Sequence, residues 1–217
     1  IATLAVSLGA EMFILDDGWF GSRNDDTSSL GDWDVDKTKF PNGLGPLIKH
    51  INEIGMEFGI WFEPEMISAN SNLYRRHPNW ILGDEKQLLG RNQYVLDLNK
   101  IEVHNYLFEK ISKILSENNI SYIKWDHNRV LPYPDQNQVK GFYRLLDKLR
   151  SFFPHVEIES CSSGGGRIDY GVLKRTHRVW LSDSNDALVR FRMQNNASIW
   201  LPSEVVGSHV GPRKCHT

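Results

Sequence analysis

The sequence predicts an α/β fold built on a parallel sheet, and three observations support this. Apolar segments of strand length alternate along the chain with longer segments of helical periodicity. No two successive strand segments are joined by the short turn that closes a β-hairpin. Unusual polar residues follow the strands rather than precede them, as in parallel α/β proteins, whose chemistry lies at the carboxyl ends of the strands. The alternation is compatible with a barrel or a doubly wound sheet.

The predicted elements are short strands separated by amphipathic helices. The strands cover residues 12–15, 57–62, the first part of 121–129, 156–160, 178–182 and, more weakly, 204–207. The helices cover a segment ending near Gly9, then 46–54, 103–115 and 139–153, the last closed by Pro154. Residues 20–43 and 67–99 are predicted mostly as loop, with one strand expected near 94–98.

Length and composition indicate one domain of an ordinary globular protein. The 217 residues carry a net charge of −2, which gives no electrostatic reason to expect nucleic acid or an anionic membrane as a partner. No apolar run approaches the length of a membrane span, and two cysteines do not form a disulfide framework, so we expect a cytoplasmic protein. The chain opens inside a helical segment without Met, which suggests a piece of a longer protein.

The segment 121–129 brings charge to a face that is expected to be buried. Side chains alternate along a strand, so Lys124 and Asp126 point to one face while Ile123 and Trp125 point to the other. If the apolar pair packs against helices, the charged pair enters the interior, where charge is costly unless it is paired or used. This indicates either a buried ion pair, or an aspartate nucleophile beside a lysine that holds substrate oxygens.

Carboxylates, or other side chains that can bind or react, follow five successive strand segments. They are Asp16 and Asp17, Trp61 with Glu63 and Glu65, Asp126, Cys161, and Asp183 with Asp186. One carboxylate in such a position is ordinary, but a series of them at one edge of a sheet is difficult to explain by stability alone. We therefore expect these residues to form one site.

Each group also has a structural explanation that the sequence leaves open. The aspartates before Gly18 could form a simple turn. Trp61 could pack in the core instead of facing the apolar side of a sugar. The segment 161–167 could be a flexible loop, although its glycines would also let the backbone approach a ligand closely. The aspartates after the 178–182 strand could cap the next helix.

Several segments resemble cofactor-binding motifs but lack residues that these motifs require. Residues 32–36 begin like a calcium loop, but Lys37 stands at the position of the required glycine and Gly43 at that of the bidentate glutamate. Residues 43–45 lack the third glycine and the preceding strand of a dinucleotide site. The eight histidines show no metal-ligand spacing, and serine-nucleophile and phosphate-loop signatures are absent. The sequence therefore predicts no metal and no cofactor.

Five segments together resemble the bacterial melibiase-type α-galactosidases, glycoside hydrolase family 36 of clan D. They are Phe-Ile-Leu-Asp-Asp-Gly-Trp at 13–19, Gly-Ile-Trp-Phe-Glu-Pro-Glu-Met at 59–66, Tyr-Ile-Lys-Trp-Asp-His-Asn-Arg at 122–129, Glu-Ser-Cys-Ser-Ser-Gly-Gly-Gly-Arg at 159–167 and Trp-Leu-Ser-Asp-Ser-Asn-Asp at 180–186. The resemblance implies a (β/α)8 TIM barrel. That barrel has a first strand, an eighth strand and flanking β-rich domains for which this chain has no room. We therefore expect residues 1–217 to be an incomplete barrel, a catalytic fragment with about strands 2 to 7 and without the β-rich domains.

The resemblance also implies roles for individual residues. Asp126 is then the nucleophile and Asp183 the acid/base of a retaining mechanism that uses no metal. The implied galactose-binding residues are Asp16, Asp17, Trp61, Arg91, Lys124, Asn128 and Cys161, together with Ser163 and Gly164 of the glycine loop. Ser163 departs from the family pattern, because the first glycine of that loop is expected there.

The expected reaction is therefore hydrolysis of terminal α-D-galactosyl residues from oligosaccharides such as melibiose and raffinose. Two other activities fit the same site, those of an α-N-acetylgalactosaminidase and of a galactosyltransferase. A sugar-binding protein without turnover is an alternative of a different class. The resemblance further implies a homo-oligomer for the full-length protein.

Overall fold

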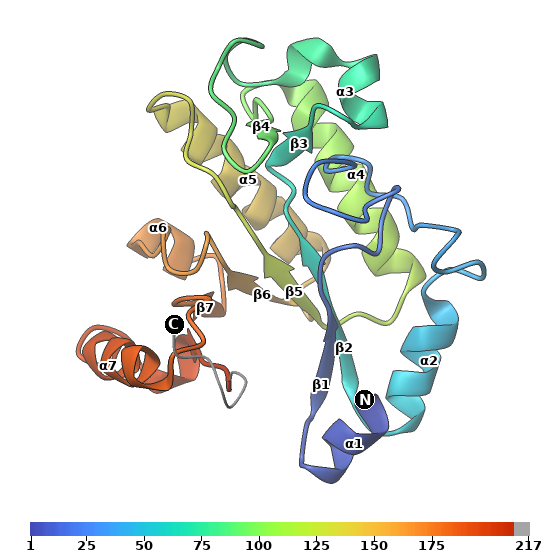
Figure 1. The fold of residues 1–217 in the computed structure, drawn as a ribbon, viewed down its shortest axis with the longest axis vertical. Coiled ribbons are helices and arrows are strands. Elements are labelled where there is room, and N and C mark those ends of the chain that lie inside the picture. Colours follow the sequence, from blue (N-terminus) through green and yellow to red (C-terminus); the bar gives the residue numbers. More distant parts are fainter. Residues whose placement is uncertain (211–217) are drawn as a thin grey trace.

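The structure, a computed structural model, describes residues 1–210 and is organised around one six-stranded sheet (Figure 1). Every strand in it pairs in parallel with its neighbours. In their order across the sheet the strands are β1 (Met12–Leu15), β2 (Glu57–Phe62), β5 (Tyr122–Trp125), β6 (Glu157–Ser160), β7 (Arg178–Trp180) and β8 (Val206–Gly207). Cys215, which the cysteine count includes, lies outside the described residues.

The order of the strands distinguishes the two architectures that the sequence left open. A doubly wound sheet reverses its strand order at a switch point. Here the order in space follows the order in the chain without a reversal, as in the wall of a barrel. The strands therefore form an α/β half-barrel. The prediction of a parallel sheet is confirmed, and the doubly wound alternative is wrong.

Helices occur in every connection between neighbouring strands, as parallel crossovers require. They are α2 (Gly45–Glu53), α4 (Ile101–Glu117), α5 (Gln136–Phe152), α6 (Tyr170–Leu173) and α7 (Ala187–Ala197), while α1 (Ala2–Ser7) precedes β1. Single 3-10 turns cover Pro78–Trp80 and Ser203–Val205. In Figure 1, α2, α4 and α5 lie on one side of the sheet, and α4 packs against α5.

The two long helices bury the faces that their sequences predict. In α4 the apolar residues spaced three or four positions apart are all buried, namely Val103, Leu107, Ile111, Ile114 and Leu115. In α5 Phe142, Leu146 and Leu149 are buried, whereas Val139 stays 38% exposed. Asp135 caps α5, because its side chain accepts hydrogen bonds from the first backbone N–H groups of the helix.

A small antiparallel pair lies between β2 and α4, where the sequence predicts mostly loop. It consists of β3 (Met66–Ser68) and β4 (Gln93–Val95), with the short helix α3 (Asn72–Arg76) between them. The strand expected near 94–98 is therefore present but begins one residue earlier and is shorter. The pairing joins residues too far apart for a hairpin turn to indicate it. Ile67 and Val95 are fully buried, so the pair extends the core.

The long 20–43 loop is packed tightly despite its polar composition. Trp33 is 1% exposed, and its ring lies 4.3 Å from that of Phe20 and 5.3 Å from that of Phe62. Trp19 also contacts Phe62, at 5.2 Å. This aromatic cluster covers the carboxyl end of β2. It therefore supports the residues that follow β2 in the chain.

The two sides of the half-barrel leave apolar groups exposed. Within residues 1–210, β1 and β8 each pair on one side only. Helix α7 buries none of its residues, and Leu188, Phe191 and Trp200 are more than 60% exposed in this part of the chain. Leu4 and Leu8, next to β1, are exposed as well.

Candidate active site

The polar groups predicted from the sequence meet at the carboxyl ends of β1, β2, β5, β6 and β7, which are neighbours in the sheet. The strand register aligns Trp61 of β2 with Lys124 of β5, and Lys124 with Glu159 of β6. Side chains opposite one another in register share a face. The prediction that these strands present their polar residues at one edge is therefore confirmed.

Asp126 follows β5, and its carboxylate is held by three hydrogen-bond donors. Its Oδ2 accepts hydrogen bonds from the indole nitrogen of Trp61 at 3.1 Å and from Nδ2 of Asn128 at 2.8 Å. Its Oδ1 accepts the backbone N–H of His127 at 2.8 Å. Asp126 is only 7% exposed. Three donors therefore fix the orientation of a carboxylate that is largely shielded from water.

Trp61 is packed in the core, which is one of the alternatives that its sequence context left open, and it also donates a hydrogen bond to Asp126. It is 3% exposed, and its ring stacks on Phe20 with the planes 10° apart and the centroids 6.1 Å apart. This is core packing. The same ring directs its N–H to Asp126. The packing of the aromatic cluster therefore fixes the ring of Trp61, and the ring in turn helps to orient the carboxylate of Asp126.

Lys124 forms the ion pair that the alternative interpretation predicts, but with Asp16 instead of Asp126. Its Nζ lies 3.1 Å from Oδ2 of Asp16 and 5.2 Å from the ring centroid of Trp180. Burial opposes the charge of Lys124, yet Asp16, followed by Cys161 and Asp126, outweighs it and leaves the pKa of Lys124 above its ordinary value. The site therefore contains a lysine that stays charged between carboxylates.

Asp183 is connected to Lys124 through Trp180. The indole nitrogen of Trp180, the last residue of β7, donates a hydrogen bond of 2.8 Å to Oδ1 of Asp183. The same ring stacks on His209 at 4.8 Å. Asp183 is exposed, in contrast to Asp126. The helix-capping alternative applies to Asp186, whose side chain accepts the Val189 N–H, and not to Asp183.

Asp16 and Asp17 also form the turn that their sequence suggests. Oδ1 of Asp16 accepts the N–H of Asp17 at 2.8 Å, and Gly18 has a φ of 101°. Asp17 makes a bidentate ion pair of 2.9–3.0 Å with Arg23, which is 2% exposed. The carboxylate of Asp16 therefore points at Lys124. The carboxylate of Asp17 is paired with Arg23 but stays partly accessible to solvent.

The 161–167 loop is tied to the Asp126 segment. Ser163 has a φ of 46°, a left-handed conformation that explains why a glycine is expected there, and its Oγ donates to Oδ1 of Asn128 at 3.3 Å. A Cβ on Gly164 would lie 2.8 Å from Cα of Ser182. Cys161 is buried, and burial, with the nearby Asp126, raises the pKa of its thiol. The loop is ordered by contacts and is not simply a flexible connection.

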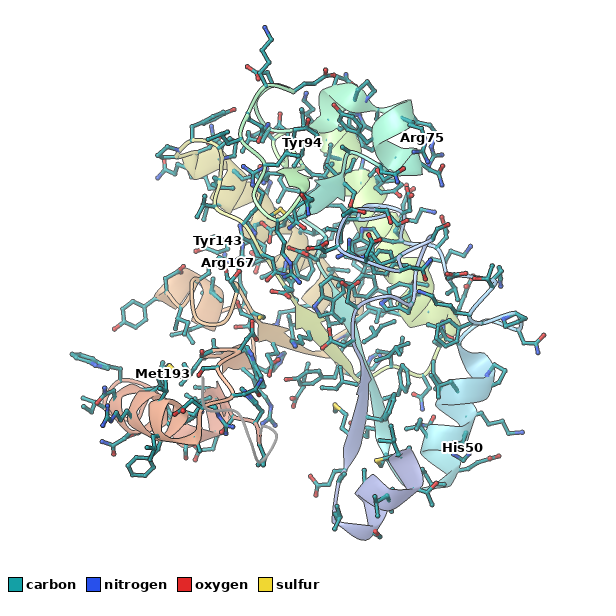
Figure 2. All side chains as sticks on the ribbon, in the orientation of Figure 1. His50, Arg75, Tyr94, Tyr143, Arg167 and Met193 are labelled. Carbon is teal, nitrogen blue, oxygen red and sulfur yellow. The ribbon has the colours of Figure 1, made fainter. Side chains whose placement is uncertain are left out.

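Glu63 and Glu65, which follow β2, are two buried carboxyls of different character. Glu65 accepts from Trp125 at 3.0 Å, and it pairs with Arg167 at 2.9 Å and His127 at 3.5 Å. Burial opposes its charge, but Arg167 and His127 outweigh burial and hold the pKa of Glu65 well below its usual range. Figure 2 shows Arg167 beside α5, where its guanidinium lies 3.8 Å from the ring centroid of Phe142. Glu63 makes no ion pair among residues 1–210, and burial raises its pKa to about 7.

Arg91 is the one predicted site residue that the structure does not join to the others. It lies in an exposed turn with a φ of 52°. Within the described part of the chain its side chain makes no hydrogen bond or ion pair. Its role in binding stays a prediction.

Two side chains of the site were missed as functional residues. Trp180 lies in a segment that the sequence singled out, but nothing in the sequence indicates that its indole reaches Asp183. Arg23 lies in the 20–43 loop, far from any strand end. The sequence offers one indication of Arg23. Asp16 and Asp17 are adjacent carboxylates with no basic residue beside them, so a basic partner is expected from elsewhere in the chain.

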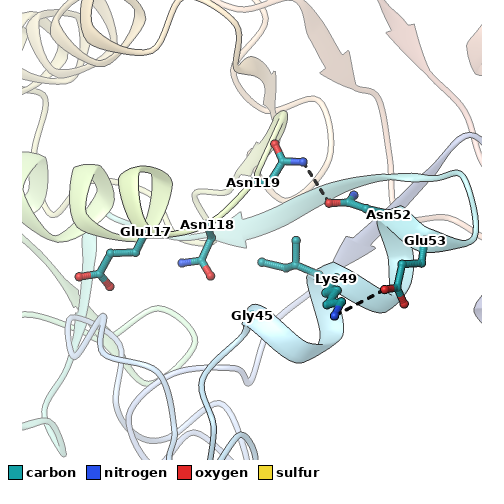
Figure 3. A pocket seen from close by; sticks show the side chains of 8 residues that line it. Gly45, Lys49, Asn52, Glu53, Glu117, Asn118 and Asn119 are labelled. Carbon is teal, nitrogen blue, oxygen red and sulfur yellow. Dashed lines mark hydrogen bonds and ion pairs between the residues drawn. The ribbon is translucent and has the colours of Figure 1, made fainter.

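One surface hollow lies at the strand ends and another lies between two of the helices. One of about 650 Å³ adjoins the site and is lined by parts of the 127–131 and 162–167 loops and by α5. The other, about 550 Å³ in volume, lies between α2 and the end of α4 (Figure 3), where Lys49 pairs with Glu53 at 3.7 Å and Asn119 donates to Asn52 at 3.0 Å. Four of its polar side chains thus pair with one another, and none of the predicted site residues lines it.

Residues 1–210 contain neither a metal-binding cluster of side chains nor a helix that could span a membrane. Among residues 1–210, no group of three or more histidine, cysteine or carboxylate side chains is arranged to bind a metal ion. None of the helices in the same range is long and apolar enough to cross a membrane.

The fold and the site together define an α/β half-barrel with convergent carboxylates and a charged lysine at the carboxyl ends of its strands. The family model described as Melibiase matches residues 1–217. The chain is 53% identical over its whole length to an alpha-galactosidase of Escherichia coli, covering 32% of that protein. The chain belongs to the melibiase family.

Solved structures agree with this assignment. The glycoside hydrolase family 36 alpha-galactosidase AgaA of Geobacillus stearothermophilus superposes with a TM-score of 0.94 at 44% identity, over 100% of this chain and 32% of that one. The galactosidase domain of the alpha-galactosidase-sucrose kinase AgaSK gives a TM-score of 0.94 at 43% identity, over 99% of this chain and 31% of that one. The chain thus spans about a third of the length of the relatives that it matches.

Proposed function

We propose that the protein carrying this chain is a retaining α-galactosidase, which cleaves terminal α-D-galactosyl residues from oligosaccharides such as melibiose and raffinose. The observation that carries the proposal is the held carboxylate of Asp126, with three hydrogen-bond donors, beside a charged lysine at the same strand edge. Structures of AgaA variants in complex with raffinose and with stachyose support the choice of substrate class.

In this mechanism Asp126 attacks the anomeric carbon while Asp183 protonates the departing glycosidic oxygen. The C–O bond to the leaving group breaks as the bond to Asp126 forms, giving a covalent galactosyl-enzyme. Asp183, now ionised, then takes a proton from water, and the resulting hydroxide displaces Asp126 with a second inversion. The two carboxyl groups and water complete the reaction. Retention requires the carboxyls to lie about 5–5.5 Å apart when sugar is bound.

The binding roles follow from charge and accessibility. Lys124 and Asp16 form a donor–acceptor pair suited to two neighbouring sugar hydroxyls, and Asp17 extends it. Trp61 forms one wall. We assign further sugar contacts to Asn128, to Cys161 and to the Ser163–Gly164 backbone, and we retain Arg91 as a residue that contacts the sugar from its exposed turn.

We infer that the half-barrel is the larger part of an incomplete (β/α)8 barrel, with residues 1–217 carrying about strands 2 to 7 and β-rich domains flanking it in the whole protein. The unreversed strand order supports this inference. So do the one-sided pairing of β1 and β8 and the exposed apolar side chains of α7 within residues 1–210. A closed barrel would cover both edges.

Turnover of an aryl α-galactoside by the full-length protein tests the proposal. We expect hydrolysis, with α-galactose as the first anomer detected by NMR. Binding of galactose without turnover would indicate the sugar-binding alternative. Faster cleavage of the aryl α-N-acetylgalactosaminide, or transfer to sucrose in preference to water, would indicate one of the two related activities instead.

A further inference from the structure

Glu63 is a buried carboxyl that contacts the segment holding Asp126. It follows β2 and is 1% exposed. A single oxygen, Oε1, accepts two hydrogen bonds: one of 2.6 Å from the backbone N–H of Asn128 and one of 2.7 Å from Nε2 of Gln93. The carboxyl therefore fixes the main chain two residues after Asp126.

Asn128 connects this contact to the carboxylate. Its side-chain amide donates to Oδ2 of Asp126 at 2.8 Å, and its amide oxygen accepts from Ser163 at 3.3 Å. The position of the Asn128 backbone decides where that amide points. Glu63 thus acts on Asp126 indirectly: it holds the backbone of Asn128, and the side-chain amide of Asn128 is one of the three donors that orient Asp126.

We propose that Glu63 is a positioning residue for Asp126 and acts through Asn128. The inference rests on the proposed function, in which Asp126 is the nucleophile. A misplacement of about 1 Å in a reacting group costs on the order of 100-fold in rate. Loss of the Glu63 contact is therefore expected to lower kcat far more than it changes KM.

Glu63 is bound to the Asn128 segment by hydrogen bonds and not by an ion pair within residues 1–210. Gln93 and Asn128 are neutral, and Asp126 is the charged group that faces Glu63. Arg129 donates to the backbone oxygen of Gln93 at 2.7 Å and not to the carboxyl. A neutral side chain of the same shape should therefore replace Glu63, whereas a shorter carboxylate should not.

Two substitutions in the full-length protein separate these properties. Glu63→Gln keeps the shape and an acceptor oxygen but removes the acid. Glu63→Asp keeps the acid but withdraws the oxygen by one methylene. With an aryl α-galactoside we expect kcat of Glu63→Gln within about threefold of the wild type. We expect kcat of Glu63→Asp to fall about 30-fold or more, with KM changed less than about threefold.

Gln138→Ala is the matched control for a loss of buried hydrogen bonds. Gln138 is 1% exposed and bridges the backbone of Leu96 and Leu98 at 2.8–2.9 Å, so neither of these hydrogen bonds involves Glu63, Asp126 or Asn128. This variant should lower the melting temperature and leave kcat unchanged. It shows how much activity a general loss of stability removes.

The proposal is overturned if folded Glu63→Gln loses more than about tenfold in kcat, or if folded Glu63→Asp keeps wild-type kcat. If Glu63→Asp does not fold, the Glu63→Gln result alone decides. Failure of the proposed function would be recognised separately, because the wild type would then show no turnover or Asp126→Ala would retain it.

Discussion

The indole nitrogen of Trp61 and the carboxylate of Asp126, which come from the neighbouring strands β2 and β5, are joined by a hydrogen bond of 3.1 Å. The contact links the aromatic cluster above β2 to the proposed nucleophile. Trp61 is therefore both a core residue and part of the site. Its two contributions can be separated by substitution.

Trp61→Phe should lower kcat/KM by about 10- to 100-fold, because a hydrogen bond to a charged group contributes about 1.5–3 kcal/mol. Steady-state kinetics on an aryl α-galactoside give the value. Trp33→Phe is the control. Trp33 is equally buried in the same cluster, but its indole nitrogen has no partner within the described residues. It should lose stability and keep kcat/KM, and an equal loss of activity in both variants would contradict the assignment.

Gly164→Ala should disrupt the 161–167 loop. Gly164 has a φ of 87°, and a Cβ there would lie 2.8 Å from Cα of Ser182 and 3.1 Å from the carbonyl oxygen of Leu181. Backbone cannot move aside as a flexible side chain can, so the loop must shift. We expect at least a tenfold loss of kcat/KM, measured by steady-state kinetics.

Gly55→Ala separates backbone strain from this clash. Gly55 has nearly the same φ, 88°, but nothing lies within 4 Å of its hypothetical Cβ. The substitution should cost about 1–3 kcal/mol of stability through strain and leave kcat/KM unchanged. Similar losses of kcat/KM in the two alanine variants would show that the loop contact is unimportant.

The stability of the protein should depend on the ionisation of Glu63. Burial and then Asp126 raise its pKa from 4.5 to about 7. A raised carboxyl pKa means that the folded state holds the proton more tightly than the unfolded state does. This contribution is therefore fully present below pH 4.5 and is lost as the pH rises through 7, with a total of about 3 kcal/mol.

Glu63→Gln cannot titrate, so it should escape this loss. Melting temperatures of the wild type and of Glu63→Gln, measured from pH 4.5 to pH 8, check the prediction. The wild type should fall by several degrees relative to the variant across this range. A difference that stays constant with pH would contradict the raised pKa.

Local sequence patterns predicted most of the fold. Residues 12–15 and 57–62 form strands with the predicted bounds, and the buried face of α4 contains every residue that its periodicity indicated. These features depend on neighbours in the chain. The β3–β4 pair does not, because its partners are brought together only by the packing of α3 and the core.

The candidate site shows the same division. Strand alternation predicted that Lys124 and Asp126 share a face, and the order of the strands brought Asp16, Trp61 and Asp183 to the same edge. Strand alternation could not predict that Lys124 forms its ion pair with Asp16 and not with Asp126. Nor could it predict that Trp180 binds Asp183, because that contact depends on the turn after β7.

The central claim, that Asp126 is the nucleophile and Asp183 the acid/base, is tested most directly by azide rescue of the two alanine variants on an activated aryl α-galactoside. In Asp126→Ala, azide should occupy the place of the missing carboxylate and attack from its side, giving β-galactosyl azide. In Asp183→Ala the galactosyl-enzyme still forms, and azide should displace Asp126 to give α-galactosyl azide. NMR of the two products decides. The opposite anomers, or an Asp126→Ala variant that loses less than about tenfold in turnover without azide, would contradict the account.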